Sequence, residues 1–142
     1  MRCRTGIRQL KDLGFEAHFC RIENTVGTGN PDVEGCLHGT TMSLELKSCD
    51  RPARATTPIR MRSNPKTRAA QSEWHRERAK AGCKHHFILI QVGEAQTARL
   101  YLIPGHRYDE IEVPEAELER MSVLPRSDCD VADVLMRASK GY

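Results

Sequence analysis

The sequence has no apolar run that approaches the ~18 residues needed to cross a bilayer as a helix. Its most apolar stretch is the short segment 87–90. The first residues, 1–4, lead into a helical pattern and lack the apolar run and cleavage site of a secretory signal peptide. These absences argue against a membrane protein and against a secreted one, and we expect a cytoplasmic protein.

The six cysteines include no C-x-x-C pair, so a zinc ribbon or zinc finger is not expected. The pairs Cys36-x-His38 and Cys83-x-His85 could together form a Cys2His2 set, but neither pair has finger spacing. A zinc-stabilised interaction protein is therefore the weakest of the alternatives. Because the chain shows no secretory signal and is longer than a disulfide-stapled mini-domain, we expect reduced thiols.

Length and composition predict one ordinary globular domain, residues 1–142. The chain is 39% hydrophobic and 29% charged, with no internal repeat and no low-complexity tract, which argues against a disordered or fibrous protein. A chain of this length buries roughly 68–70% of the surface that its unfolded form exposes. One apolar core therefore suffices without disulfides or metals.

Positive charge is concentrated in one segment of the chain. Residues 51–68 carry six basic side chains and no acidic one, whereas the remaining sixteen basic residues are outnumbered by nineteen acidic ones. Such a block is typical of a surface that binds a polyanion, and the alternative is a solvated, mobile loop. Its three prolines break any long helix, so we expect a loop or arm that could become ordered only on binding. The basic residues are Arg51, Arg54, Arg60, Arg62, Lys66 and Arg68.

Hydrophobic periodicity and turn residues predict helices alternating with strands. The first helix, residues 2–13, places Leu10 and Leu13 on its apolar face and ends at Gly14. The order α-β-β-β-α-β-β-α predicts one sheet flanked by helices, in an α/β or α+β sandwich. The other predicted elements are strand 15–20, hairpin strands 32–37 and 41–48, helix 67–81 ended by Gly82, strands 87–90 and 99–103, helix 114–121, and a final helix that begins with a capping box of Ser127 and Asp130.

This pattern brings three ionisable residues together at one end of the hairpin. Glu45 and Lys47 share a face of the second strand, because alternate side chains point to the same side. The tight turn at 38–39 places Asp32, at the start of the first strand, beside the end of the second. On an exposed surface these residues would form an ordinary salt bridge. Beside the glycine-rich loop 27–31 and a basic segment, they are typical of a site for a hard divalent cation and a phosphodiester.

The same residues carry a resemblance to a nuclease family. Pro31-Asp32 followed by Glu45-Leu46-Lys47 resembles the signature of the PD-(D/E)XK nuclease superfamily. The resemblance implies an α/β fold, in which a single domain has a central mixed sheet flanked by helices. Its restriction-endonuclease-like α-β-β-β-α-β core would span about 5–103, and a C-terminal helical extension about 114–140.

A longer pattern narrows the resemblance to one branch of that superfamily. Gly27-x-Gly29 before the signature, and Gln71-x-x-Trp74 leading to Gly82 after it, are similar to the virus-type replication-repair nuclease (VRR-NUC) branch. Members of this branch include stand-alone phage proteins and relatives of Holliday junction resolvases. The resemblance covers about residues 5–92. Within it, Trp74 is interpreted first as a core anchor of its helix.

The resemblance implies a role for each residue of the signature. Asp32 and Glu45 would be carboxylate ligands of Mg²⁺ or Mn²⁺, with the Leu46 backbone carbonyl and several waters completing the coordination. Lys47 would position the attacking water or stabilise the developing negative charge. Gln71 would hydrogen-bond that water or the Lys47 side chain, whereas without the motif it would be interpreted as a solvated helix residue.

The expected function is a metal-dependent DNA endonuclease, structure-selective in phage or bacterial replication, repair or recombination. The basic segment would contact the DNA, and the backbone of Gly29 and Asn30 would approach the scissile phosphate. The alternatives are a non-catalytic DNA-binding module of the same fold and a site-specific endonuclease of the restriction or homing type. Junction cleavage would favour a homodimer, for which the C-terminal helix could supply an interface. Related nucleases often carry a further acidic ligand, and we assign none among Asp12, Glu16 and Glu23.

Overall fold

The computed structural model describes residues 3–22 and 29–142. Within these residues, five strands form one mixed sheet in the order β1-β2-β3-β4-β5. Strands β3 and β4 run parallel, and the other neighbouring strands run antiparallel. The elements in chain order are α1 (Cys3–Asp12), β1 (Ala17–Arg21), β2 (Val33–Leu37), β3 (Thr40–Cys49), α2 (Pro65–Lys80), β4 (His86–Val92), η1 (Ala95–Thr97), β5 (Arg99–Pro104), η2 (Gly105–Glu110), α3 (Glu115–Met121) and α4 (Val131–Ala138).

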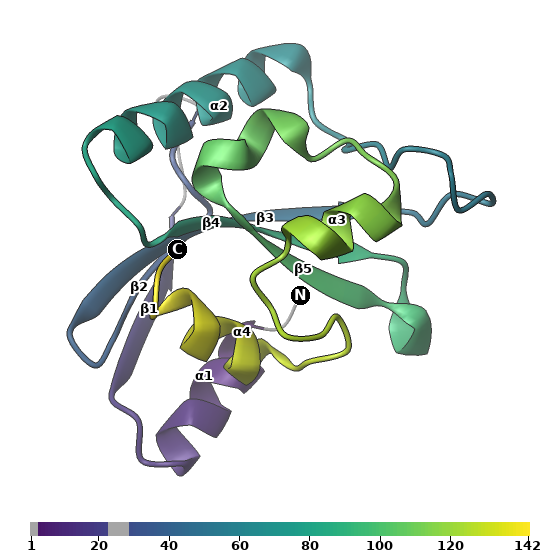
Figure 1. Cartoon of the computed structure of the whole chain (residues 1–142). Helices are drawn as coiled ribbons and strands as arrows, with labels where there is room; N and C mark the ends of the chain where they lie inside the picture. Colours follow the sequence, from purple (N-terminus) through teal and green to yellow (C-terminus); the bar gives the residue numbers. More distant parts are fainter. Residues whose placement is uncertain (1–2, 23–28) are drawn as a thin grey trace.

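Helices cover both faces of the sheet (Figure 1). Helices α1 and α4 pack together on one face, while α2, η2 and α3 lie on the other. The mixed sheet between two helical layers, with its α-β-β-β-α-β order, confirms the predicted single-domain α/β fold. In the described part of the chain, no helix has the length and apolar character to span a bilayer.

Most turns and caps fall where the sequence predicts them. The hairpin between β2 and β3 turns at His38 and Gly39, whose φ angles of 49° and 81° suit a two-residue hairpin loop. Gly14 and Gly82, each with φ of 86°, follow α1 and α2 in the left-handed conformation that glycine favours. Helix α2 begins at Pro65 rather than at the predicted position 67, so Pro65 starts the helix instead of breaking it, and Asn64 is the N-cap residue, whose side chain accepts a hydrogen bond from the Thr67 N–H.

Two local predictions are wrong. Leu13 is 71% exposed rather than part of the apolar face of α1, because the helix ends at Asp12 and Leu13 leaves the helical register. The capping box of α4 joins Asp130 to Asp133 rather than to Ser127. Asp130 is the N-cap residue, and a capping box pairs that residue with the third residue inside the helix.

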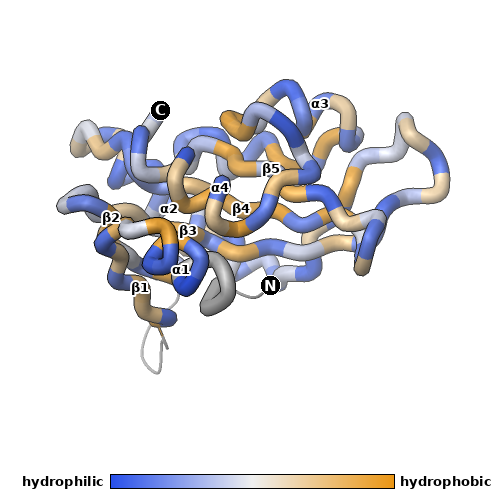
Figure 2. Tube along the Cα trace, turned by 90° about the horizontal axis from the view of Figure 1, so that it is seen from below, coloured by the Kyte–Doolittle hydropathy of each residue, from blue (hydrophilic) through white to orange (hydrophobic). Residues whose placement is uncertain are grey.

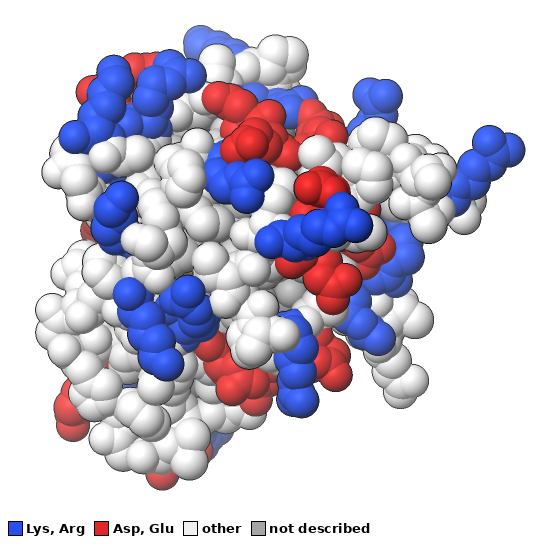
Figure 3. All heavy atoms as spheres, in the orientation of Figure 1, with Lys and Arg blue, Asp and Glu red and all other residues white. Residues whose placement is uncertain are grey.

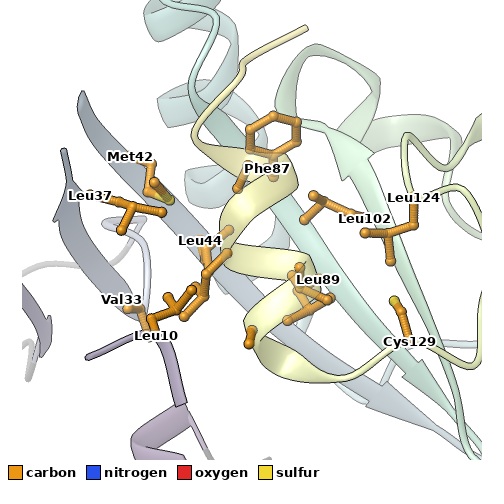
Figure 4. Close-up of a cluster of buried hydrophobic side chains, with 14 residues drawn as sticks. Leu10, Val33, Leu37, Met42, Leu44, Phe87, Leu89, Leu102, Leu124 and Cys129 are labelled. Carbon is orange, nitrogen blue, oxygen red and sulfur yellow. The ribbon is translucent and has the colours of Figure 1, made fainter. Parts of the chain in front are cut away.

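The face covered by α1 and α4 holds one of two apolar cores (Figure 4). Leu44 of β3, Leu89 of β4 and Leu135 of α4 are among its buried members. Since side chains alternate along a strand, the residues on either side of Leu44 are directed to the opposite face, toward α2. The apolar positions of β3 thus determine the face on which Glu45 and Lys47 lie.

The opposite face holds a second apolar core, which includes part of the basic segment 51–68. Buried residues of β4 and β5, two strands with many hydrophobic positions in Figure 2, pack with Ile59 of this segment and with Leu118 of α3. Ile59 is 0% exposed, and its N–H donates to the Val113 carbonyl at 3.0 Å. The expectation of an arm that becomes ordered only on binding is therefore wrong, because the apolar residues between the arginines anchor the segment.

Helix α2 packs on the sheet through polar residues. Its buried residues are Gln71, Ser72 and His75. Trp74, predicted as the core anchor, is only half-buried, and the Arg78 guanidinium lies 4.7 Å from its ring centroid. A helix on a sheet normally buries an apolar stripe. The buried face of α2 is polar, which indicates that hydrogen bonds hold this helix against the sheet, including those from Gln71 to β3.

Candidate active site

Asp32 lies beside the second strand of the hairpin, as the predicted register requires. Val33 pairs with Leu44, so Asp32 stands one residue further along, opposite Glu45. The Leu46 N–H donates to Asp32 Oδ2 at 2.8 Å, which continues the contact between the strands beyond the start of β2. Because the N–H and C=O of a strand residue lie on the same side of the strand, the Leu46 carbonyl is directed toward the edge that holds Asp32.

Glu45 is a buried carboxylate with only part of its hydrogen-bonding capacity used. Its side chain is 2% exposed, and Oε1 lies 3.4 Å from Lys47 Nζ. Oε2 is buried and receives no hydrogen bond from an N–H group in the described structure, and the carboxyl group of Glu45 lies close enough to that of Asp32 for the two to share a proton. Burial raises the pKa of Glu45 to about 8, assisted by the negative charge of Asp32 and opposed by the positive charge of Lys47. The site thus holds a carboxylate whose charged form lacks sufficient positive partners.

Gln71 joins the two β3 residues to α2. Its Nε2 donates to Glu45 Oε1 at 2.6 Å, and its Oε1 accepts from Lys47 Nζ at 2.6 Å. The contact with Lys47 is the one that the sequence motif implies. The solvated alternative for Gln71 is wrong, since this side chain is buried. One amide therefore fixes the distance between the carboxylate and the ammonium.

Tyr108 is a member of this network that the sequence did not reveal. It lies in η2, is 5% exposed, and its hydroxyl donates to Gln71 Oε1 at 2.6 Å. Its ring centroid is 5.9 Å from Lys47 Nζ. Burial, and then the charge of Glu45, raise the pKa of Tyr108 above its ordinary value, so the hydroxyl keeps its proton and acts as a donor.

Two buried histidines lie behind Tyr108. His75 of α2 stacks on Tyr108 with ring centroids 5.6 Å apart, and its Nδ1 lies 2.8 Å from Nδ1 of His86. Burial lowers the pKa of His75 to about 3 and that of His86 to about 4, so both rings are neutral. His86 Nε2 in turn meets the Tyr142 hydroxyl at 2.5 Å. No sequence motif assigns these histidines a role, and in the structure they pack behind Tyr108 and hydrogen-bond to each other.

The loop before β2 approaches α2 closely. A Cβ on Gly29 would lie 2.8 Å from the Ala70 carbonyl oxygen, and Gly29 has φ of 110°, which a residue with a side chain rarely adopts. Packing against α2 thus accounts for this glycine, which is buried, whereas Asn30 is exposed. Gly27, which belongs to the motif, and Glu23 lie outside the described residues.

Three basic side chains of segment 51–68 are held by acidic residues outside the segment. The ion pairs are Arg51 with Glu115, Arg62 with Asp50, and Arg68 with Glu112. The first pair is bidentate, with distances of 2.8 and 2.9 Å. Figure 3 shows acidic atoms beside basic ones over the part of the surface that carries the segment and α3. The segment therefore does not present its six charges together.

The other three basic side chains of the segment are Arg54, Arg60 and Lys66. They are exposed, and among the described residues they form no ion pair within 4.0 Å. These cations remain open to a polyanion.

The residues around Glu45 suit a hard divalent cation. A cation would satisfy the partnerless Glu45 oxygen and offset the repulsion between Glu45 and Asp32. The described residues contain no cluster of three or more His, Cys, Asp or Glu side chains that could hold a metal, so neither Asp12 nor Glu16 adds a third carboxylate, and the two Cys-x-His pairs do not meet. Two carboxylates are a set that suits Mg²⁺, which keeps several waters.

Comparison with known proteins gives a likeness in the fold. No protein-family model and no curated protein matches the sequence. Among solved structures, the chain is similar to Hjc, a Holliday junction resolvase from the archaeal hyperthermophile Archaeoglobus fulgidus. The match has a TM-score of 0.37 and 16% sequence identity, and it covers 70% of this chain and 72% of that chain. At this similarity no residue role is carried over, so the function is inferred from the side chains themselves.

Proposed function

We propose that this protein is a divalent-metal-dependent DNA endonuclease of the PD-(D/E)XK type, within or close to the VRR-NUC branch. The observation that carries the proposal is Glu45 Oε2, a buried carboxylate oxygen without a hydrogen-bond partner in the described structure, beside Asp32. A buried charge is costly unless it is paired or coordinates a metal. Asp32 is partly buried and the Lys47 side chain keeps 10% of its surface exposed, so these two residues connect the buried Glu45 to the surface.

Asp32, Glu45 and the Leu46 carbonyl would hold Mg²⁺ or Mn²⁺. When bound, the ion would lower the pKa of a coordinated water and withdraw charge from the phosphate under attack. The protein contributes a fixed geometry, because the Leu46 N–H orients Asp32 and the Gln71 amide orients Glu45. This orientation restricts the carboxylates before any ligand arrives.

Lys47 would stabilise the negative charge that develops on the phosphate. Its ammonium is held by Gln71 at 2.6 Å and by Glu45 at 3.4 Å, so its position is set before the substrate binds. Preorganised charge of this kind costs no reorganisation during the reaction. Lys47 and Gln71 are therefore the catalytic residues beside the two carboxylates.

The basic segment and the exposed Asn30 would contact the DNA backbone, whereas Gly29, predicted to do so as well, is buried against α2. Arg54, Arg60 and Lys66 provide three exposed cations without ion pairs among the described residues, while Arg51, Arg62 and Arg68 would first have to leave their acidic partners. Phosphate contacts of this kind position the protein without reading the base sequence. We expect structure-selective cleavage in replication, repair or recombination.

The proposal predicts cleavage that requires a divalent metal and Asp32. Supercoiled plasmid should be nicked or linearised in Mg²⁺ or Mn²⁺ and remain intact in EDTA. Asp32→Asn should lower the cleavage rate about 10³-fold, since a metal supplies several kcal/mol of transition-state stabilisation. Glu34→Gln is the matched control, because it removes a carboxylate two residues away on the same face of β2 and should cut at the wild-type rate.

Other outcomes would point to the alternatives. DNA binding without cleavage in any metal would indicate a non-catalytic module, and unimpaired cleavage by Asp32→Asn would contradict the site. Matched linear, flapped, single-stranded and four-way substrates would separate structure selectivity from site-specific cleavage. A sizing column run on the same preparation would test for the homodimer that paired cuts in opposed strands favour.

A further inference from the structure

We infer that Tyr108 is a positioning residue that sets the orientation of the Gln71 amide and, through it, of Lys47 and Glu45. The inference rests on the proposed nuclease function and deepens it. Tyr108 belongs to η2, outside the signature of the motif, and lies 37 residues after Gln71 in the chain. It reaches Gln71 from η2, which packs against α2, whereas Lys47 and Glu45 reach the same side chain from β3.

The first step concerns the two donors on one oxygen. Gln71 Oε1 accepts from Lys47 Nζ and from the Tyr108 hydroxyl, both at 2.6 Å. An amide oxygen has two lone pairs, so both are occupied. The amide nitrogen must then be the atom that faces Glu45, where it donates to Oε1 at 2.6 Å. The flipped amide would place an N–H group against the Lys47 ammonium, which can only donate, and would lose the hydrogen bond that the Tyr108 hydroxyl now gives to the amide oxygen.

The second step concerns what the amide orientation controls. In the observed orientation Gln71 gives a donor to the carboxylate and an acceptor to the ammonium, matching the charge of each. The flipped orientation would oppose both charges. Without the Tyr108 hydroxyl, the Gln71 oxygen would keep Lys47 as its one donor in the described structure, and Lys47 is the group that must remain available for the phosphate. Tyr108 therefore lets Lys47 engage the substrate while the amide stays in place.

The third step concerns the rigidity of Tyr108 itself. Its ring is buried and stacks on His75 with an interplanar angle of 20°. His75 is held by His86, and a Cβ on Gly105, at the start of η2, would lie within 2.4 Å of both imidazoles. Because position 105 has no side chain, the start of η2 can pack directly against the two imidazole rings. Because its ring packs against the histidine pair, the Tyr108 hydroxyl is held in one position relative to Gln71.

Replacement of Tyr108 by Phe removes the hydroxyl and keeps the ring. Tyr108→Phe should lower kcat for DNA cleavage about 10- to 100-fold, the usual effect of losing a group that orients a catalytic residue. KM should stay within about two-fold, because Tyr108 contacts no DNA in the proposal. Tyr101→Phe is the matched control: Tyr101 is 3% exposed and donates its hydroxyl to Glu115 Oε1 at 2.7 Å, so the hydrogen bond that this variant removes does not involve Gln71. Both variants should lower the Tm by a similar amount, about 3 °C, and only Tyr108→Phe should lower kcat strongly.

A double-mutant cycle distinguishes positioning from a general structural effect. In a Gln71→Ala background, Tyr108→Phe should change kcat by less than about two-fold, because the group through which it acts is gone. In the metal-free protein, the NMR signals of the Gln71 side-chain amide should shift in Tyr108→Phe and not in Tyr101→Phe. Multiplicative losses in the cycle, an unshifted amide signal, or wild-type kcat in Tyr108→Phe would each overturn the inference. An inactive wild-type protein would instead overturn the proposed function.

Discussion

The two charged regions of this protein are organised in opposite ways. At the proposed catalytic site, which comprises Asp32, Glu45, Lys47 and Gln71, strands and a helix bring a few charged side chains together in a largely buried position. Segment 51–68 has more charges, but its basic side chains lie at the surface, and three of the six are paired with acidic residues outside the segment. The loss of one contact at the buried site is costly in free energy, whereas exposed ion pairs contribute about 0–1 kcal/mol each to stability.

This difference indicates which region determines the reaction and which adjusts binding. A buried carboxylate with too few partners is stabilised strongly by a bound cation, so a substitution beside it changes the energy of the charged group. The surface ion pairs of the segment are weak enough for a phosphate to replace the acidic partner. We therefore expect substitutions at the site to alter turnover and substitutions in the segment to alter affinity and its dependence on salt.

The largest expected effect separates two lysines, one in each region. Lys47→Met keeps most of the side-chain volume and removes the charge, so kcat should fall about 10³-fold, or about 4 kcal/mol in the activation barrier. Lys66→Met removes an exposed charge at the start of α2, and should leave kcat intact while weakening DNA binding less than about five-fold. Steady-state cleavage kinetics on one duplex measures both constants. Equal losses of kcat in the two variants would contradict the division of roles.

The next effect tests the anchoring of the segment in the free protein. Ile59→Ala should lower the free energy of unfolding by about 3 kcal/mol, because it empties a fully buried position between the sheet and α3. Arg60→Ala, at the exposed neighbouring position, should change stability by less than about 0.5 kcal/mol. Urea denaturation without DNA measures both values. Equal stabilities would mean that the segment is not anchored until it binds.

Much of the site could be predicted because it depends on one hairpin. A turn at His38 and Gly39 and the alternation of apolar residues along β3 fix the strand register, and a shift by one residue would reverse every side chain. Once the register is set, Asp32 must stand opposite Glu45. The helix predicted over 67–81 and ended by Gly82 likewise matches α2 apart from its first residues, and it places Gln71 within hydrogen-bond distance of β3.

The remaining features depend on contacts between distant parts of the chain. Tyr108 lies in an irregular segment, where no periodicity indicates which way a side chain points. The partner of Arg51 is 64 residues away and that of Arg68 is 44 residues away, so a count of charges within the segment could not reveal them. Ile59 and Met61 lie among prolines and arginines, and two apolar residues are too short a pattern to predict burial.

The smallest expected effect measures how many cations of the segment face DNA. If Arg54, Arg60 and Lys66 alone neutralise phosphates, the slope of log affinity against log salt should be about −2.7, compared with about −5.4 for all six.

Glu112→Gln should release Arg68 while keeping an oxygen for the Met61 N–H, so affinity should rise a few-fold at low salt and the slope should steepen to about −3.6. Fluorescence anisotropy with a labelled duplex in EDTA measures these slopes. Glu119→Gln, which removes an exposed charge on α3, controls for net charge and should leave the slope unchanged. An unchanged slope in Glu112→Gln would mean that Arg68 serves the fold rather than the DNA, and that its ion pair belongs with the buried contacts of Ile59 as part of the anchor.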